Sequence, residues 1–232
     1  MDTSGRVTRH LQEELEQLKT QLLVMAGAAE EQVSAAVLSL VDRDYKLAER
    51  VLGGDDPINQ FHLELDERCF QLLALHQPMA TDLRIVVSAV KINSDLERIG
   101  DFAINVAEAA LRYLRHPAVK PLIDIPKMAD VAQGMLRDAL NAYVQQDTVL
   151  AQAVLDRDDT LDGLKDQVFR ELLSFMLSNP TITEPALELI LISRHLERIG
   201  DHATNIAEEA IFIVSGLDVR HHAREGAVSD DR

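Results

Sequence analysis

The chain has 232 residues, of which 47% are hydrophobic and 27% are charged, so it is not a disordered chain. Aromatic residues make up only 4%, with no Trp, which favours helices over β-sandwiches. A formal net charge of −16 excludes nucleic acid as a partner, and anionic lipid would repel such a surface. We therefore expect any membrane association to be peripheral and to go through partner proteins.

Cysteine usage and hydropathy predict a cytoplasmic location. The single cysteine, Cys69, excludes an intramolecular disulfide and is typical of the reducing cytosol. The first residues contain no apolar core, so we expect no signal peptide. The apolar run from Ala186 to Ile192 is interrupted by Glu188 and is shorter than the ~18 residues that a membrane span needs.

The first half of the chain reads as helices in sequence order. Apolar residues recur every three or four positions from Leu11 to Leu40, which predicts a long helix with one buried seam. A short helix or turn is expected near residues 44–52 and ends at Gly53-Gly54. Two more long helices are expected at 57–75 and 81–115, separated by a break at Pro78. The proline-rich segment 116–126 is a linker.

The second half repeats this order, with helices expected at 126–146, 160–177 and 185–214. Residues 44–56 match 147–159 at a shift of 103, and beyond Pro78 and Pro180 the shift becomes 100. We predict an all-α fold of two pseudo-symmetric antiparallel three-helix bundles that arose by internal duplication. The expected boundaries are 1–116 for the first bundle, 117–217 for the second and 218–232 for a flexible C-terminal tail.

The third helix of each half carries the same acidic stripe. Glu97, Asp101, Asn105 and Glu108 recur as Glu197, Asp201, Asn205 and Glu208. On a helix these spacings place the four side chains in a strip roughly 80° wide, where like charges repel. A solvated face is the ordinary explanation of one such stripe, but its recurrence in both halves favours a bound cation.

The preceding helix of each half offers further oxygen ligands. Asp55 and Asn59 are four residues apart, and Asp158 and Asp162 repeat the spacing; acids at a helix start can equally serve as caps. If the helices pack side by side, each half pools about four oxygen ligands, which suit Mg²⁺, Mn²⁺, Ca²⁺ or iron. The predicted metal ligands are Asp55, Asn59, Glu97, Asp101, Asp158, Asp162, Glu197 and Asp201, with Asn105, Glu108, Asn205 and Glu208 as possible additions.

Motifs of catalysis are missing from the sequence. It contains no Glu-x-x-His spacing, no phosphate-binding Gly-rich loop and no Gly-x-Ser-x-Gly. We therefore expect a protein that is not an enzyme. A metal-storage or metal-dependent hydrolytic bundle is the alternative, and a plain helical scaffold with solubilising acids is a third.

These residues resemble the PhoU family of phosphate-signalling regulators over nearly the full length. The resemblance rests on Gln77-Pro78-Met79-Ala80-Thr81-Asp82-Leu83-Arg84 and on Glu-Arg-Ile-Gly-Asp at 97–101 and 197–201. It implies multinuclear iron or zinc clusters on the acidic motifs, with Asn59 standing where the family has a second acid. It also implies a cytosolic negative regulator of the phosphate-starvation response that connects a high-affinity phosphate ABC transporter with a sensor histidine kinase. The long apolar helix faces make a homodimer plausible.

Overall fold

The computed structural model describes residues 3–54 and 56–217, and this part of the chain is all-α, as predicted. The predicted long helices are present, with ends within two residues of the expected ones, except that the first helix begins eight residues earlier, at Thr3 rather than Leu11. The helices are α1 (Thr3–Val41), α2 (Tyr45–Leu52), α3 (Asp56–His76), α4 (Ala80–Leu114), α5 (Asp124–Gln145), α6 (Thr148–Leu155), α7 (Asp158–Ser178) and α8 (Thr183–Ser215), with a 3₁₀ turn at Pro180–Ile182 before α8. The tail expected at 218–232 lies outside the described residues.

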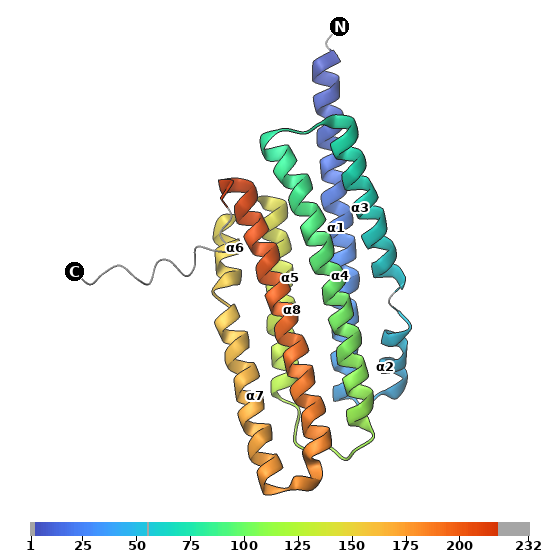
Figure 1. Cartoon of the computed structure of the whole chain (residues 1–232), viewed down its shortest axis with the longest axis vertical. Coiled ribbons are helices and arrows are strands. Elements are labelled where there is room, and N and C mark those ends of the chain that lie inside the picture. Colours follow the sequence, from blue (N-terminus) through green and yellow to red (C-terminus); the bar gives the residue numbers. More distant parts are fainter. Residues whose placement is uncertain (1–2, 55, 218–232) are drawn as a thin grey trace, which may run out of the picture.

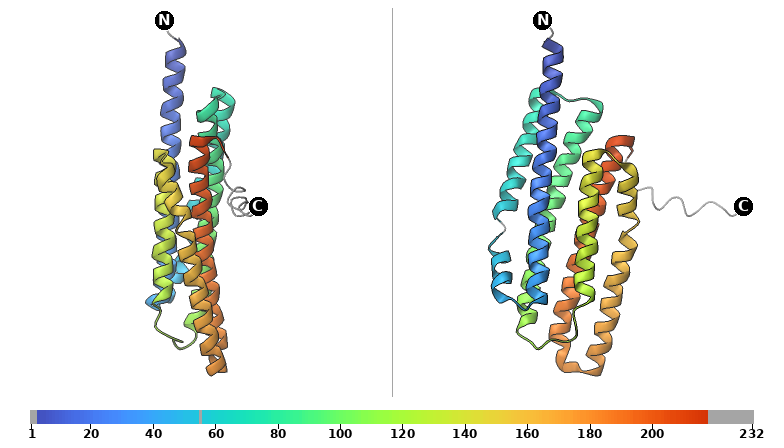
Figure 2. Two further views of the ribbon diagram at one scale, coloured as in Figure 1. Left: turned by 90° about the vertical axis from the view of Figure 1, so that its left-hand side faces the viewer. Right: turned by 180° about the vertical axis from the view of Figure 1, so that it is seen from behind.

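Helices α4 and α8 run antiparallel and pack against each other in the middle of the molecule (Figure 1). Helices α3 and α7 lie on the outer flanks, against α4 and α8 respectively, and α1 and α5 form a second layer behind them (Figure 2). The chain therefore builds α1–α4 and α5–α8 as two similar units around a pseudo-twofold axis between α4 and α8. Their apolar side chains form one continuous buried cluster.

The start of the short helix in each unit explains part of the sequence repeat. The Leu47 N–H donates to Asp44 Oδ1 over 3.0 Å, and the Leu150 N–H donates to Asp147 Oδ1 over 3.0 Å. Both aspartates are therefore N-caps, which satisfy backbone donors that a helix start leaves free. The repeated Asp44 and Asp147 thus fix the backbone rather than a ligand.

Two glycines allow the outer helices to approach the central ones. A Cβ on Gly100 would lie 3.0 Å from Ile58 Cδ1 of α3, and a Cβ on Gly200 would overlap Leu161 Cδ2 of α7. Each glycine costs roughly 1 kcal/mol of helix propensity relative to Ala. This close approach brings the acids of neighbouring helices to one surface.

Polar side chains also join the two units. His202 Nδ1 on α8 lies 2.7 Å from Asp95 Oδ1 on α4, and the buried Glu209 accepts from the Ser88 hydroxyl and from Lys91 Nζ at 2.8 and 2.7 Å. Such buried, paired groups favour one relative position of the helices, because a slip would leave a charge without its partner.

Helix α1 is the one described segment that meets the length and composition of a membrane span, between His10 and Val41. This differs from the expectation from the sequence that no stretch is long enough. However, 50% of its most apolar window is buried inside the protein, where Leu15, Leu18 and Leu22 belong to the core. Core helices pass the same test, so the segment is weak evidence for a membrane span.

Candidate metal site

The acids predicted in the second half come together between α7 and α8. Asp158 and Asp162 start α7, and Glu197 and Asp201 lie on the part of α8 that packs beside it. Burial raises the pKa of Asp201 to about 6, with further contributions from the negative charges of Glu197, Asp158 and Asp162. Burial, reinforced by Asp162, Asp159 and Glu197, also raises the pKa of Asp158. A raised pKa means that the ionised carboxylate is destabilised. A cation bound at this surface would stabilise both carboxylates.

A cation already lies in this second cluster, and it is a side chain of the chain itself. Lys165 Nζ is 3.0 Å from Asp162 Oδ1 and 3.3 Å from Glu197 Oε1. Hydrogen bonding to Asp162 and the negative charge of Glu197 outweigh desolvation and raise the pKa of the Lys165 ammonium group. The sequence interpretation missed this lysine, although its spacing of three residues from Asp162 on a helix indicates a possible ion pair.

The donor set fits a hard divalent cation in its chemistry. It offers carboxylate oxygens with raised pKa values and no thiolate, which is the ligand type of Mg²⁺, Mn²⁺, Ca²⁺ or iron rather than of a tetrahedral zinc–thiolate site. Within the described residues, no three His, Cys, Asp or Glu side chains are placed so that they could hold a metal ion as they stand. Binding would therefore require the acids to close in and Lys165 to move away.

Asp55, the predicted ligand equivalent to Asp158, lies outside the described residues. Among the described residues the first-half cluster differs from the second in two ways. Asn59 is an exposed amide where the second half has Asp162. The position equivalent to Lys165 is His62, whose Nδ1 is buried with no hydrogen-bond partner and whose Nε2 lies 3.7 Å from Asp66 Oδ2. Glu97 and Asp101 are present on α4 as predicted.

Arginines accompany both stripes. Arg98 donates from Nη1 to Asp101 Oδ2 over 3.1 Å and lies 3.6 Å from Glu97, while Arg198 Nε is 4.0 Å from both Glu197 and Asp201. These exposed pairs are worth roughly 0–1 kcal/mol each. Because these pairs are weak, a metal ion would displace the guanidinium groups from the carboxylates at little cost.

The outer residues of the stripes point to other partners. Asn205 donates from Nδ2 to Asp95 Oδ1 of the other unit over 3.1 Å, and Glu108 lies 3.8 Å from Arg112. Asn105 and Glu208 are half-buried on the same faces. The structure therefore associates Asn205 with the junction between the units, and a metal-ligand role for these four residues stays a prediction.

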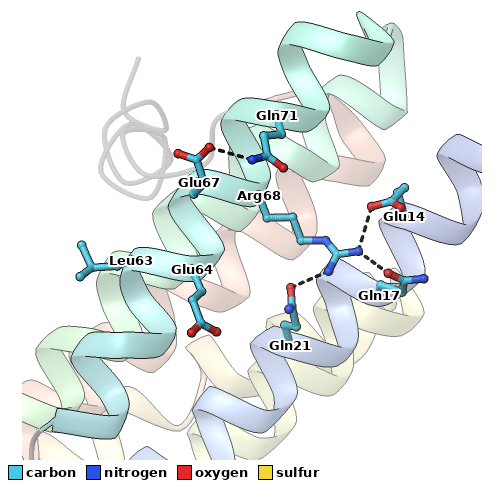
Figure 3. A pocket seen from close by; sticks show the side chains of 8 residues that line it. All are labelled: Glu14, Gln17, Gln21, Leu63, Glu64, Glu67, Arg68 and Gln71. Carbon is cyan, nitrogen blue, oxygen red and sulfur yellow. Dashed lines mark hydrogen bonds and ion pairs between the residues drawn. The ribbon is translucent and has the colours of Figure 1, made fainter.

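A shallow depression lies on the outer side of α1 and α3, and the side chain of Arg68 spans it (Figure 3). We interpret it as a polar bridge between the two helices rather than as a ligand site. Arg68 reaches from α3 to α1, where it donates to Glu14 Oε2 at 2.9 Å, to Gln21 Oε1 at 3.1 Å and to Gln17 Oε1. At the equivalent place of the second unit, Lys120 bonds Glu171 of α7 and Asp124 of α5. The same bridge between helices thus occurs twice, with the charges interchanged.

Fold and site together define a duplicated all-α protein with an oxygen-ligand cluster between the outer and central helices. The family model of the PhoU domain matches residues 22–110 and 125–210, one match in each unit. The chain belongs to the PhoU family.

Relatives and solved structures agree over nearly the whole length. Proteins described as phosphate-specific transport system accessory protein PhoU homologues are 41% identical in Aquifex aeolicus, covering 91% of this chain and 96% of the relative, and 40% identical in Pseudomonas aeruginosa, covering 95% and 93%. The crystal structure of PhoU from Pseudomonas aeruginosa has a TM-score of 0.84 at 40% identity, over 89% of this chain and 99% of that one. The phosphate transport system regulatory protein PhoU from Streptococcus pneumoniae also has a TM-score of 0.84, at 29% identity, over 90% and 99%.

Proposed function

We propose that this chain is a non-enzymatic regulator of phosphate-specific transport. The observation that carries the proposal is the match of both units to the PhoU domain, together with relatives of about 40% identity that are named accessory proteins of that transport system. Support for a binding role comes from the acidic clusters, in which Asp101 pairs with Arg98 and Glu197 pairs with Lys165.

The finer proposal is an adaptor that works in the cytoplasm. It contacts components of the phosphate ABC transporter and a sensor histidine kinase, and it keeps the phosphate-starvation response silent when phosphate is abundant. The net charge of −16 favours protein partners over lipid or nucleic acid, so the membrane is reached through the transporter. Partners can be regulated in this way only if the chain binds their conformational states with different affinity.

We further propose that the acidic clusters hold metal ions, in multinuclear iron or zinc clusters, with Mg²⁺, Mn²⁺ or Ca²⁺ as other cations that suit the ligands. Support comes from the raised pKa values of Asp158 and Asp201, which burial raises first and neighbouring acids raise further, because a bound cation would stabilise the charged carboxylates. A homodimer is part of the proposal as well. Light scattering that finds only the 25.8 kDa monomer at high concentration would refute that part.

The regulatory proposal is tested by a phosphate-starvation reporter in a strain that lacks this chain and grows in abundant phosphate. We expect high constitutive expression that the wild-type chain restores to silence. A reporter that stays silent in the deletion strain contradicts the role. Retention of the chain by membranes that contain the transporter, and not by membranes without it, tests the partner directly.

The metal proposal is tested separately with Glu197→Gln combined with Asp201→Asn. We expect this pair to abolish binding of Mn²⁺ at the second cluster, because it removes two of the four carboxylates. Asp42→Asn combined with Glu49→Gln removes the same charge at exposed positions of the first unit and should leave binding unchanged. Equal binding by both double variants and the wild type refutes the site, whereas loss of a hydrolytic turnover together with the metal would favour the enzymatic alternative.

A further inference from the structure

A cavity of about 350 Å³ opens between α1, α2 and α3 of the first unit. Its deeper wall contains Ile58 and Gln32, both buried, and its rim contains Glu31 and Arg50, both exposed. The volume lies at the lower end of the range of small-ligand pockets, roughly 300–1,000 Å³. The described residues that line it include none of the acidic-stripe residues of α4.

Gln32 in this wall is a buried amide with no partner. The residue is only 8% exposed, and neither Oε1 nor Nε2 has a hydrogen-bond partner in the structure. Its Oε1 lies 3.4 Å from the position of a Cβ on Gly100. A buried polar group left unsatisfied costs about 1–3 kcal/mol, so it calls for an explanation such as a missing ligand. In the second unit the same place holds the thioether of Met135, near Gly200, which needs no partner.

The second unit shows what fills this space when it is closed. At the position equivalent to Gly54 stands Arg157, which crosses to α5 and pairs with Asp138. Its Nη1 lies 3.7 Å from the Cβ position of Gly134. The first unit has Gly54, Ala35 and Glu31 in place of Arg157, Asp138 and Gly134, respectively. The space is open there because the arginine and its aspartate are absent, and a carboxylate stands one helical turn away.

We propose that this cavity binds an arginine side chain presented by a partner protein. The guanidinium group would take the place that Arg157 occupies in the second unit, donating to the Glu31 carboxylate and to the Gln32 amide oxygen. Rotation about the Gln32 side-chain bonds turns that oxygen from Gly100 towards the cavity. The arginine stem would pack on Ala35 and Ile58, because long cationic side chains bury their methylene groups along apolar surface. The proposal depends neither on metal binding nor on the phosphate role.

The charged residues at the rim allow an arginine ligand to be distinguished from an anionic ligand by mutation. Arg50 stands at the opening and repels a guanidinium, whereas it would attract a phosphate group. Removing its charge should therefore strengthen the binding of an arginine probe and weaken the binding of any anion. Removing the charge of Glu31 should have the opposite effect in each case.

The test uses the full chain and the probe N-acetyl-arginine amide, followed by methyl NMR shifts of Ile58, Leu47 and Val51, which line the cavity. We expect saturable shifts with a Kd of about 1–10 mM, as befits a single side chain. N-acetyl-citrulline amide has nearly the same shape without the charge and should give no saturable shift. Shifts that are absent, or equal for the two probes, would overturn the proposal.

Variants sharpen the result. Glu31→Gln should weaken the arginine probe at least threefold, and Arg50→Gln should strengthen it by a similar factor. Gly54→Arg with Ala35→Asp copies the second unit and should abolish binding by filling the space from within; far-UV circular dichroism checks its fold. If that variant does not fold, the opposite effects of Glu31→Gln and Arg50→Gln decide alone. Weaker binding in Arg50→Gln, or inorganic phosphate that shifts the same methyl groups, refutes the proposal.

Discussion

Replacing Lys165 by Met should strengthen metal binding at the second cluster, because the lysine occupies the place of the cation. Lys165 Nζ lies 3.0 and 3.3 Å from oxygens of Asp162 and Glu197. At an effective dielectric constant of ~20, each pair would attract by about 5 kcal/mol before any correction. Asp162 is 49% exposed, however, so water screens the charges, and measured values for such pairs are roughly 0.2–1 kcal/mol.

Two such pairs give a total of about 0.4–2 kcal/mol that a metal ion must overcome in the wild-type chain. Since 1.4 kcal/mol corresponds to tenfold in affinity, Lys165→Met should lower the Kd of the site for Mn²⁺ about 2- to 30-fold. Methionine keeps the length of the apolar stem, so the change removes the charge and little of the packing.

Isothermal titration of Mn²⁺ into chelator-treated protein at pH 7 measures the effect. The matched control is Lys19→Met, which removes an equal charge from α1, where Lys19 Nζ pairs with Glu16 at 2.8 Å. An unchanged or higher Kd in a folded Lys165→Met variant, with a wild type that does bind, would refute the competition between lysine and metal. A wild type that binds no Mn²⁺, Fe²⁺ or Zn²⁺ at all would instead refute the metal site.

Three further predictions concern stability. Gly200→Ala should lower the free energy of urea-induced unfolding by about 1–2 kcal/mol, because the added Cβ would overlap the buried Leu161. Gly100→Ala should lower it by less, because the added Cβ would lie 3.0 Å from Ile58. An equal effect of the two variants would contradict the closer approach at Gly200. Arg68→Met should cost about 1–3 kcal/mol by removing the bridge from α3 to α1, and a chemical denaturation curve identical to that of the wild type would show that the bridge contributes nothing. The pKa of Asp201, raised from 3.8 to about 6, means that the folded state holds this proton more tightly than the unfolded state. The stability that it contributes is therefore fully present below about pH 4 and is lost as pH rises through about 6. Relative to Asp201→Asn, the metal-free wild type should lose stability between about pH 4 and pH 6 and lose no more above about pH 7. Parallel pH profiles of the two proteins would exclude this raised pKa.

The helices could be predicted from the sequence because their signals are local. The apolar seam that starts at Leu11 and the break at Pro78 each depend on a few neighbouring residues, and the structure follows them. The internal repeat then predicts the same helices for the second half. The glycines at 100 and 200 were informative for the same reason, since a costly residue that occurs twice in a helix predicts a steric need, and the need is a neighbouring helix.

The contacts across helices were not predictable in this way. Lys165 reaches Glu197 and Arg157 reaches Asp138 only because the helices pack in one particular register, which hydrophobic periodicity does not specify. The acidic stripe itself was found, but the side chain that neutralises part of it lies on another helix. A list of acidic residues alone therefore omits the cations that compete for the same oxygens.

The two units keep the same backbone while their side-chain chemistry has diverged. Positions that determine the path of the chain are alike, as the caps Asp44 and Asp147 and the close approaches at Gly100 and Gly200 show.

Positions that determine binding differ between the units. The second unit contains its own cations, because Lys165 lies among its acids and Arg157 fills the space beside α5. The first unit has His62 and Gly54 at these two places, with unsatisfied polar atoms on His62 and Gln32. One unit therefore satisfies its charged groups internally, while the other leaves polar groups without partners. From this difference we expect the first unit to provide the surface that responds to arginine-bearing partners, and the second to provide the more self-contained half of the scaffold.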